Sequence, residues 1–486
     1  MLSALLFAAL CLPAEKPTPK VYVVLWFDTE DYVLPASDDA ALWVADFLTK
    51  QKIRGTFKVV GEKARTLAAR KRQDVIAALK QHEIGYHSDF HSVHPTPAMY
   101  LSNLDWDEGV EEFERREGQG WRDVERIFGQ KPTCYGQPGS SWGPQSYGAL
   151  ARWNMIYLDS GSHVSLDGKP CYFAGVLNLY RLTHTIRADL NKPDELEKAF
   201  DRFSAARKEL LAEGGGIVSI VYHPCEWVHR KFWDGVNFVK GTNPPREKWV
   251  LPPQKTAEET GLSKRIFADY IAYMQRFKDV EFITASQAAK LYADRSRNHK
   301  FTLADLRAVA ARVGDGVTYQ AHNGFTLSAA ETFGLLNRLM AVPPEKAKAG
   351  QGPLPFSPLG PTSRLAMMSE AVTCDASQFT RTVQDVEAYI ARHRRLPGTI
   401  WLGSVGVTPE AYLRTLAKVV LERLDGREIP ANLTFQPTTL AAEKYVSADD
   451  PKLWGWVIFP PGFRAPAMMD LARRQAWTIK PALLQP

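Results

Sequence analysis

Short apolar runs alternate with amphipathic helical stretches between residues 21 and 292, and this alternation constrains the fold more than any other feature. The runs expected to form strands are residues 21–27, 55–60, 155–158, 216–222 and 280–284. Several of them are apolar without alternation, as strands covered on both faces are. The order of strand, helix and strand predicts a parallel sheet with helical crossovers. Over about 270 residues it predicts an α/β barrel with its functional groups at the carboxyl ends of the strands.

The composition is that of an ordinary globular protein with material for two or three domains, since 45% of the 486 residues are hydrophobic and 23% are charged. Sixty lysine and arginine residues against 54 acidic residues give a net charge of +6. These charges are spread along the chain rather than gathered into a basic tail or stripe, which argues against nucleic-acid binding. The sequence leaves the oligomeric state open.

Residues 1–14 form an apolar run that ends in a small residue and is followed by a polar segment. This length fits a signal peptide and is too short for the roughly 20 apolar residues of a membrane span. No later segment is apolar enough over such a length. We therefore expect an exported protein without a stable membrane span, secreted or located in the periplasm or cell envelope. A misassigned start is the alternative.

The composition changes after residues 295–300, which are expected to be a linker. From 300 to 486 the chain has Ala- and Leu-rich helical patterns with a weak internal repeat, because residues 305–333 resemble residues 385–412. Each copy indicates a helix, a short hairpin and a second helix. Since the repeats lack clustered catalytic residue types, they favour a binding or packing module.

Three carboxylates occur in four residues directly after the first apolar run, at Asp28, Glu30 and Asp31. Like charges held together raise one another's pKa unless a cation or solvent separates them. A metal ion would supply that cation. The alternative is an acidic turn that caps the following helix.

Four of the eleven histidines lie between positions 82 and 94. Two of them, His87 and His91, are four residues apart and can converge on one ion. Zinc accepts two imidazole nitrogens and a carboxylate oxygen while keeping positions open for water and substrate. A further histidine, His223, follows the run 216–222 and is well placed for proton transfer near neutral pH. Taken alone, such a histidine is more often a hydrogen-bonded core or surface residue.

The order of these three signals resembles the NodB-type polysaccharide deacetylases of carbohydrate esterase family 4. The resemblance covers about residues 21–291 and includes 55–61, similar to the family's second strand, and 282–286, similar to its closing strand. It implies a distorted (β/α) barrel over residues 21–292, followed by a mainly helical repeat region over 300–486.

The same resemblance implies roles for the residues that carry it. Asp28 corresponds to the general base and His223 to the general acid. The metal ligands would be His87, His91 and Glu30, with Asp31 as a rival to Glu30. The implied cofactor is a divalent metal, with zinc favoured, and the implied reaction is hydrolysis that releases acetate or a similar acyl group.

Two positions depart from the family's pattern. The family's third motif contains an arginine, whereas this chain has Gln137, which cannot supply a fixed cation to a catalytic carboxylate. The fourth motif is reduced to Asp159, which either orients a catalytic group or is a turn residue after a strand. These departures bear on substrate class and rate more than on metal binding.

Residues 376–424 look somewhat like pseudomurein-binding repeats, with residues 302–340 as a more diverged copy. Such repeats would keep the enzyme near an insoluble wall polymer, while a generic helical domain explains the same periodicity. The leading hypothesis is therefore a deacetylase acting on a polysaccharide or peptidoglycan-like substrate. The alternatives are a hydrolase of another C–N bond on the same barrel and a non-catalytic glycan-binding protein on a decayed barrel.

Overall fold

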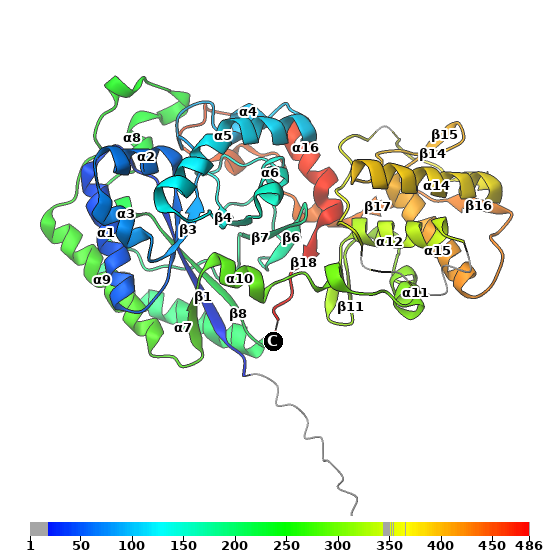
Figure 1. Cartoon of the computed structure of the whole chain (residues 1–486), viewed down its shortest axis with the longest axis horizontal. Helices are drawn as coiled ribbons and strands as arrows, with labels where there is room; N and C mark the ends of the chain where they lie inside the picture. The colour runs from blue at the N-terminus through cyan, green and yellow to red at the C-terminus, as the bar shows by residue number, and fades with distance from the viewer. Residues whose placement is uncertain (1–17, 344–349, 351, 353, 365, 486) are drawn as a thin grey trace, which may run out of the picture.

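The computed structural model describes residues 18–343, 350, 352, 354–364 and 366–485 (Figure 1). The expected signal peptide at residues 1–14 lies outside them. Within the described part of the chain, no helix combines the length and the apolar character that crossing a membrane requires.

A ten-stranded sheet forms the first domain, with the strand order β18-β6-β7-β5-β4-β3-β2-β1-β8 and with β9 also paired to β1. The parallel strands are β1 (Val21–Thr29), β2 (Thr56–Val59), β3 (Glu83–Tyr86), β4 (Cys134–Tyr135), β5 (Ile156–Asp159), β7 (Val176–Tyr180), β8 (Gly216–Tyr222) and β9 (Val280–Ile283). Two antiparallel strands, β6 (Cys171–Phe173) and β18 (Lys480–Pro481), extend one end. The predicted distorted (β/α) barrel is confirmed. Its sheet is curled and open, because the described strands do not pair around a full circle.

Helices connect and cover these strands (Figure 1). They are α1 (Pro35–Lys50), α2 (Gly61–Ala69), α3 (Gln73–Leu79), α4 (Pro97–Leu101), α5 (Trp106–Phe128), α6 (Ser146–Trp153), α7 (Leu196–Ala212), α8 (Asp234–Asn237), α9 (Ala257–Gln275) and α10 (Ala285–Leu291). The longest, α5, begins where the Asp105 side chain accepts a hydrogen bond from the backbone N–H of Glu108 and ends at Gly129, which has φ of 63°. An N-cap of this kind is worth about 1 kcal/mol, and glycine adopts the left-handed stop without a Cβ penalty.

The strand register brings the ends of four strands together. Asp28 on β1 lies opposite Lys58 on β2, and Phe27 lies opposite Tyr222 on β8. His223 therefore emerges from β8 beside Asp28. Val59 on β2 pairs with Tyr86 on β3, so His87 follows at the same edge of the sheet. Parallel strands thus deliver these side chains to one site, as their carboxyl ends commonly do.

The C-terminal region contains two copies of a helix, a hairpin and a second helix. The first copy consists of α11 (Leu303–Ala311), β11 (Gln320–His322), β12 (Phe325–Leu327) and α12 (Ala329–Ala341). The second consists of α14 (Ala376–His393), β14 (Ile400–Leu402), β15 (Val405–Val407) and α15 (Pro409–Leu424). Four further short strands accompany them. They are β10 (Gly316–Val317), which pairs with β17 (Thr439–Leu440), and β13 (Val372–Asp375), which pairs with β16 (Asn432–Phe435).

After these repeats the chain returns to the sheet domain. Helix α16 (Pro466–Arg474) lies between the repeats and the sheet in Figure 1. Strand β18 then pairs with β6 at the sheet's end. The last part of the predicted region 300–486 therefore completes the first domain.

Candidate metal centre and active site

Three predicted ligands meet in space. Glu30, His87 and His91 each offer one ligand atom, and these atoms all lie within 4.8 Å of one another. Glu30 Oε2 is 2.9 Å from His91 Nε2 and 3.8 Å from His87 Nε2. All three side chains are buried, with residue exposures of 2 to 4%. Two imidazole nitrogens and a carboxylate oxygen form a donor set that suits a zinc ion with open positions.

Neighbouring groups orient the two imidazoles. His87 Nδ1 lies 2.9 Å from the carbonyl oxygen of Gly136, and His91 Nδ1 lies 2.7 Å from Ser92 Oγ. With Nδ1 engaged in this way, Nε2 of each ring is left to face Glu30. Metal-binding histidines are commonly held through their second nitrogen like this.

One orphaned atom also fits a bound cation. Among the described residues, Glu30 Oε1 is buried and has no hydrogen-bond partner. Burial alone would raise the pKa of Glu30, but His91 and His87 hold that pKa well below its ordinary value. An ionised, buried carboxylate with a free oxygen is costly unless a cation is close by. The residues present therefore fit a divalent metal.

The structure separates Glu30 from its rival Asp31. Asp31 Oδ2 lies 3.2 Å from His229 Nε2, and its other carboxylate oxygen accepts a hydrogen bond from the backbone N–H of Val33. Lys63 donates to the Asp31 carbonyl oxygen. Asp31 thus belongs to a neighbouring buried network and is absent from the group of potential ligands.

This separation predicts that Glu30→Gln and Asp31→Asn differ in metal binding. We expect Glu30→Gln to weaken the affinity by more than the roughly 10- to 100-fold that outer-shell substitutions cost. Asp31→Asn should keep the wild-type affinity, because its carboxylate faces His229. Competition with a chromophoric chelator measures both variants, and a larger loss for Asp31→Asn would contradict the assignment.

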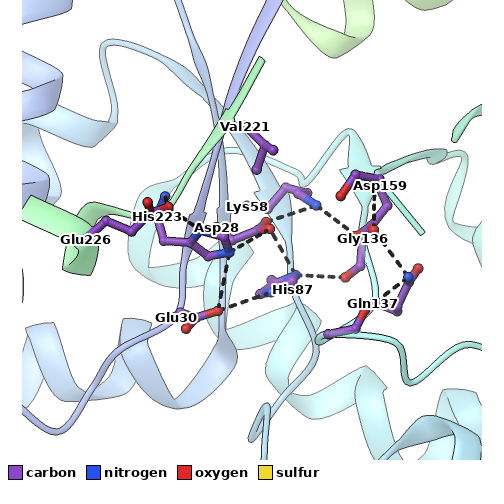
Figure 2. A network of polar contacts seen from close by, with 12 residues as sticks. Asp28, Glu30, Lys58, His87, Gly136, Gln137, Asp159, Val221, His223 and Glu226 are labelled. Atoms are coloured by element: carbon purple, nitrogen blue, oxygen red, sulfur yellow. Dashed lines mark hydrogen bonds and ion pairs between the residues drawn. The ribbon is translucent and has the colours of Figure 1, made fainter. Parts of the chain in front are cut away.

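Asp28 lies beside the three ligands and is held by a cation. Its Oδ1 is 2.9 Å from Lys58 Nζ and 3.5 Å from His87 Nδ1, and its Oδ2 is 3.6 Å from His223 Nε2 (Figure 2). Burial raises the pKa of Asp28, but the charges of His87, Lys58 and His223 outweigh this and lower it. Asp28 is therefore ionised and able to accept a proton.

His223 is oriented by a residue that the sequence analysis did not assign. Glu226 accepts hydrogen bonds from the His223 backbone N–H at 3.0 Å and from Nδ1 at 2.7 Å, and Arg187 pairs with the same carboxylate. Nε2 of His223 is thereby turned toward Asp28. Burial lowers the pKa of His223, but the hydrogen bond to Glu226 and nearby carboxylates raise it to about 9. His223 is thus protonated near neutral pH.

The positions that depart from the family's pattern form a second polar group. Gln137 Nε2 donates to Asp159 Oδ1 at 3.2 Å, and Asp159 Oδ2 lies 3.4 Å from Lys58 Nζ. Burial raises the pKa of Asp159 to about 6, although Lys58 opposes this shift. Asp159 therefore faces Lys58, and it is Glu226 that contacts His223.

All five predicted site residues line one cavity of about 630 Å³. Its apolar wall includes Phe232, Trp456 and Val457. The Trp456 indole packs edge-on against the His91 ring, with centroids 5.2 Å apart, and its Nε1 donates to Asp234 at 2.6 Å. The segment that follows the repeats thus supplies part of the cavity wall.

No family model and no curated protein matches the sequence. Among solved structures, the chain is similar to a Mycobacterium smegmatis protein assigned as a polysaccharide deacetylase, with 17% identity, 57% of this chain and 92% of that chain covered, and a TM-score of 0.37. It is also similar to the Puue allantoinase, with 13% identity, 56% of this chain and 90% of that chain covered, and a TM-score of 0.37. A third similar structure is the wild-type BA3943 protein of Bacillus anthracis, a pseudoenzyme of carbohydrate esterase family 4. Its identity is 15%, the match covers 55% of this chain and 65% of that chain, and the TM-score is 0.30.

Proposed function

We propose that the protein is a metal-dependent hydrolase that removes acetyl or similar N-acyl groups from a polysaccharide or peptidoglycan-like substrate. The observation that carries this proposal is the convergence of a buried Glu-His-His group with an ionised aspartate and a protonated histidine in one cavity. A glycan-binding module would need none of these groups in combination. The non-catalytic alternative is therefore the weaker one.

Glu30, His87 and His91 would hold the divalent metal, and zinc suits two imidazoles and one carboxylate. When bound, such an ion supplies Lewis-acid catalysis, which polarises a carbonyl oxygen and lowers the pKa of water.

The remaining residues move protons. The Asp28 carboxylate accepts a proton from the attacking water, because it is ionised and lies beside the ligand group. His223 donates the proton at Nε2 to the departing nitrogen, while Glu226 holds Nδ1. Opposite starting protonation states on two neighbouring groups are what a general base and a general acid require.

The cavity wall supports a ring-shaped substrate. Trp456 and Phe232 present aromatic surface beside the polar residues of the site. Aromatic side chains combine a large apolar face with a polar edge, which suits the apolar face of a sugar ring. The export expected from residues 1–14 and the wall binding expected of the repeats would bring the enzyme to an extracellular glycan.

We expect Trp456→Ala to raise the KM for a chitooligosaccharide by about 5-fold, since an aromatic contact contributes on the order of 1 kcal/mol beyond its burial. Trp456→Phe keeps a ring and should remain near the wild-type KM. Steady-state kinetics on both variants tests this role. An unchanged KM in Trp456→Ala would remove Trp456 from the substrate site.

Acetate release and bound metal together test the proposed function. The purified protein is expected to contain a divalent metal and to release acetate from N-acetylglucosamine oligomers or peptidoglycan. Metal binding without release from any glycan would favour hydrolysis of a different C–N bond. Absence of both would favour a binding protein.

A further inference from the structure

We propose that Lys58 is the positioning residue that fixes the Asp28 carboxylate for catalysis, and that two glycines leave the space that its side chain occupies. This inference rests on the proposed role of Asp28. The cation beside Asp28 is Lys58, which lies within β2. Gln137, which stands where the family's third motif has an arginine, is neutral and does not supply this charge.

Lys58 is fully buried and its ammonium group has fixed partners. Nζ lies 2.9 Å from Asp28 Oδ1, donates to the Leu158 carbonyl oxygen at 2.8 Å and is 3.4 Å from Asp159 Oδ2. The ammonium also lies 4.0 Å from the centre of a Trp26 ring. Three oxygens and an aromatic face leave this cation little freedom to move.

Two glycines make room for this side chain. A Cβ built on Gly136 would lie 1.9 Å from Lys58 Nζ, and one built on Gly85 would lie 2.8 Å from Lys58 Cγ. Any larger residue at position 136 would therefore displace the ammonium from its oxygens, because a packed interior has no spare volume. Glycine at these two positions therefore leaves the space that the Lys58 side chain occupies.

The second carboxylate keeps Lys58 in place. Asp159 Oδ1 accepts hydrogen bonds from Gln137 Nε2 and from the backbone N–H groups of Ser160 and Gly161, which leaves Oδ2 toward Lys58. Figure 2 shows Lys58 between the two aspartates. With Oδ1 of Asp28 held by Lys58, Oδ2 is the oxygen that faces His223. Holding a reacting group in a fixed position accounts for a large part of the rate enhancement of an enzyme.

The test compares Lys58→Met with Lys480→Met. Lys480 is a matched control, because it is also buried between two carboxylates, 2.7 Å from Asp294 and 2.9 Å from Glu331, at the far edge of the sheet. We expect Lys58→Met to lower kcat about 100-fold with KM and metal content nearly unchanged. Lys480→Met should lose stability while its folded fraction keeps the wild-type kcat. Equal kcat in both folded variants would overturn the proposal.

Gly136→Ala provides a second variant that retains every charge. It should lower kcat in the same way as Lys58→Met if the position of the ammonium matters. A wild-type kcat in a folded Gly136→Ala protein would also overturn the proposal.

A melting experiment on the metal-free protein separates this inference from the proposed function. We expect Lys58→Met and Asp28→Asn to be non-additive in Tm, with the double variant more stable than the sum of the single effects predicts. Additive effects would contradict the Lys58–Asp28 contact whatever the protein hydrolyses. If the coupling is present but no substrate is cleaved, the proposed hydrolase function is contradicted, whereas the contact between Lys58 and Asp28 is supported.

Discussion

Replacing Asp28 with asparagine is expected to lower kcat about 10³-fold, within the range that general acid–base catalysis contributes. Asparagine has the same shape but cannot accept a proton from water. The three predicted ligands remain, so the variant should still bind one metal per chain. Acetate release measured beside metal content, determined by mass spectrometry, distinguishes loss of the base from loss of the ion.

Asp294→Asn is the matched control for this experiment. Asp294 is a largely buried carboxylate paired with a buried lysine at 2.7 Å, like Asp28, but it lies beside β18 and away from the cavity. Both substitutions remove one buried charge, so both should destabilise the fold. Near-wild-type kcat in Asp28→Asn would show that another group takes the proton.

Much of this site could be predicted because its residues follow strand ends. Asp28 and His223 end or follow long apolar runs, and parallel pairing then brings such positions together. The spacing of His87 and His91 also agrees with the observed group. The choice between Glu30 and Asp31 could have been narrowed as well, since the alternation of side chains along a strand places Glu30 on the same side as Asp28.

The roles of other residues could not be predicted from the sequence, because they depend on packing between distant parts of the chain. Lys58 lies inside a four-residue strand, where a lysine is unexpected, and its partners come from β1 and β5. The signal was present, because a charged residue within a buried strand needs a partner. Trp456 reaches the site only after the chain has formed both repeats, and no local pattern indicates that return. Strands β3 and β4 are too short for periodicity to identify.

Glu226 gave a clearer local signal, since it stands three residues after His223. In the structure His223 and Glu226 cap the short 3₁₀ helix η2 (Pro224–Trp227), so one turn of chain fixes the imidazole. This arrangement leaves Nε2 directed toward Asp28 in the cavity.

The second large effect is expected for His223→Ala, with a loss of about 10²- to 10³-fold in kcat for an N-acetylated glycan. An amide nitrogen must be protonated to depart, and in the proposed mechanism His223 Nε2, which lies beside Asp28, supplies that proton. An activated aryl acetate has a leaving group that needs no proton. We therefore expect the variant to keep most of its activity on the aryl ester, and equal losses on both substrates would contradict the role of His223 as a general acid.

The pH dependence of kcat/KM also tests the role of His223 as a general acid. In the proposed mechanism activity requires protonated His223, so it is expected to fall as pH rises through the pKa of this group, which Glu226 raises. Glu226→Gln removes that negative charge, lowers the pKa of His223 and should move the alkaline limb of the profile to lower pH. Glu259→Gln, which removes an exposed carboxylate paired with Arg230, should leave the limb in place. An alkaline limb that stays in place or moves to higher pH in Glu226→Gln would contradict its assignment to His223.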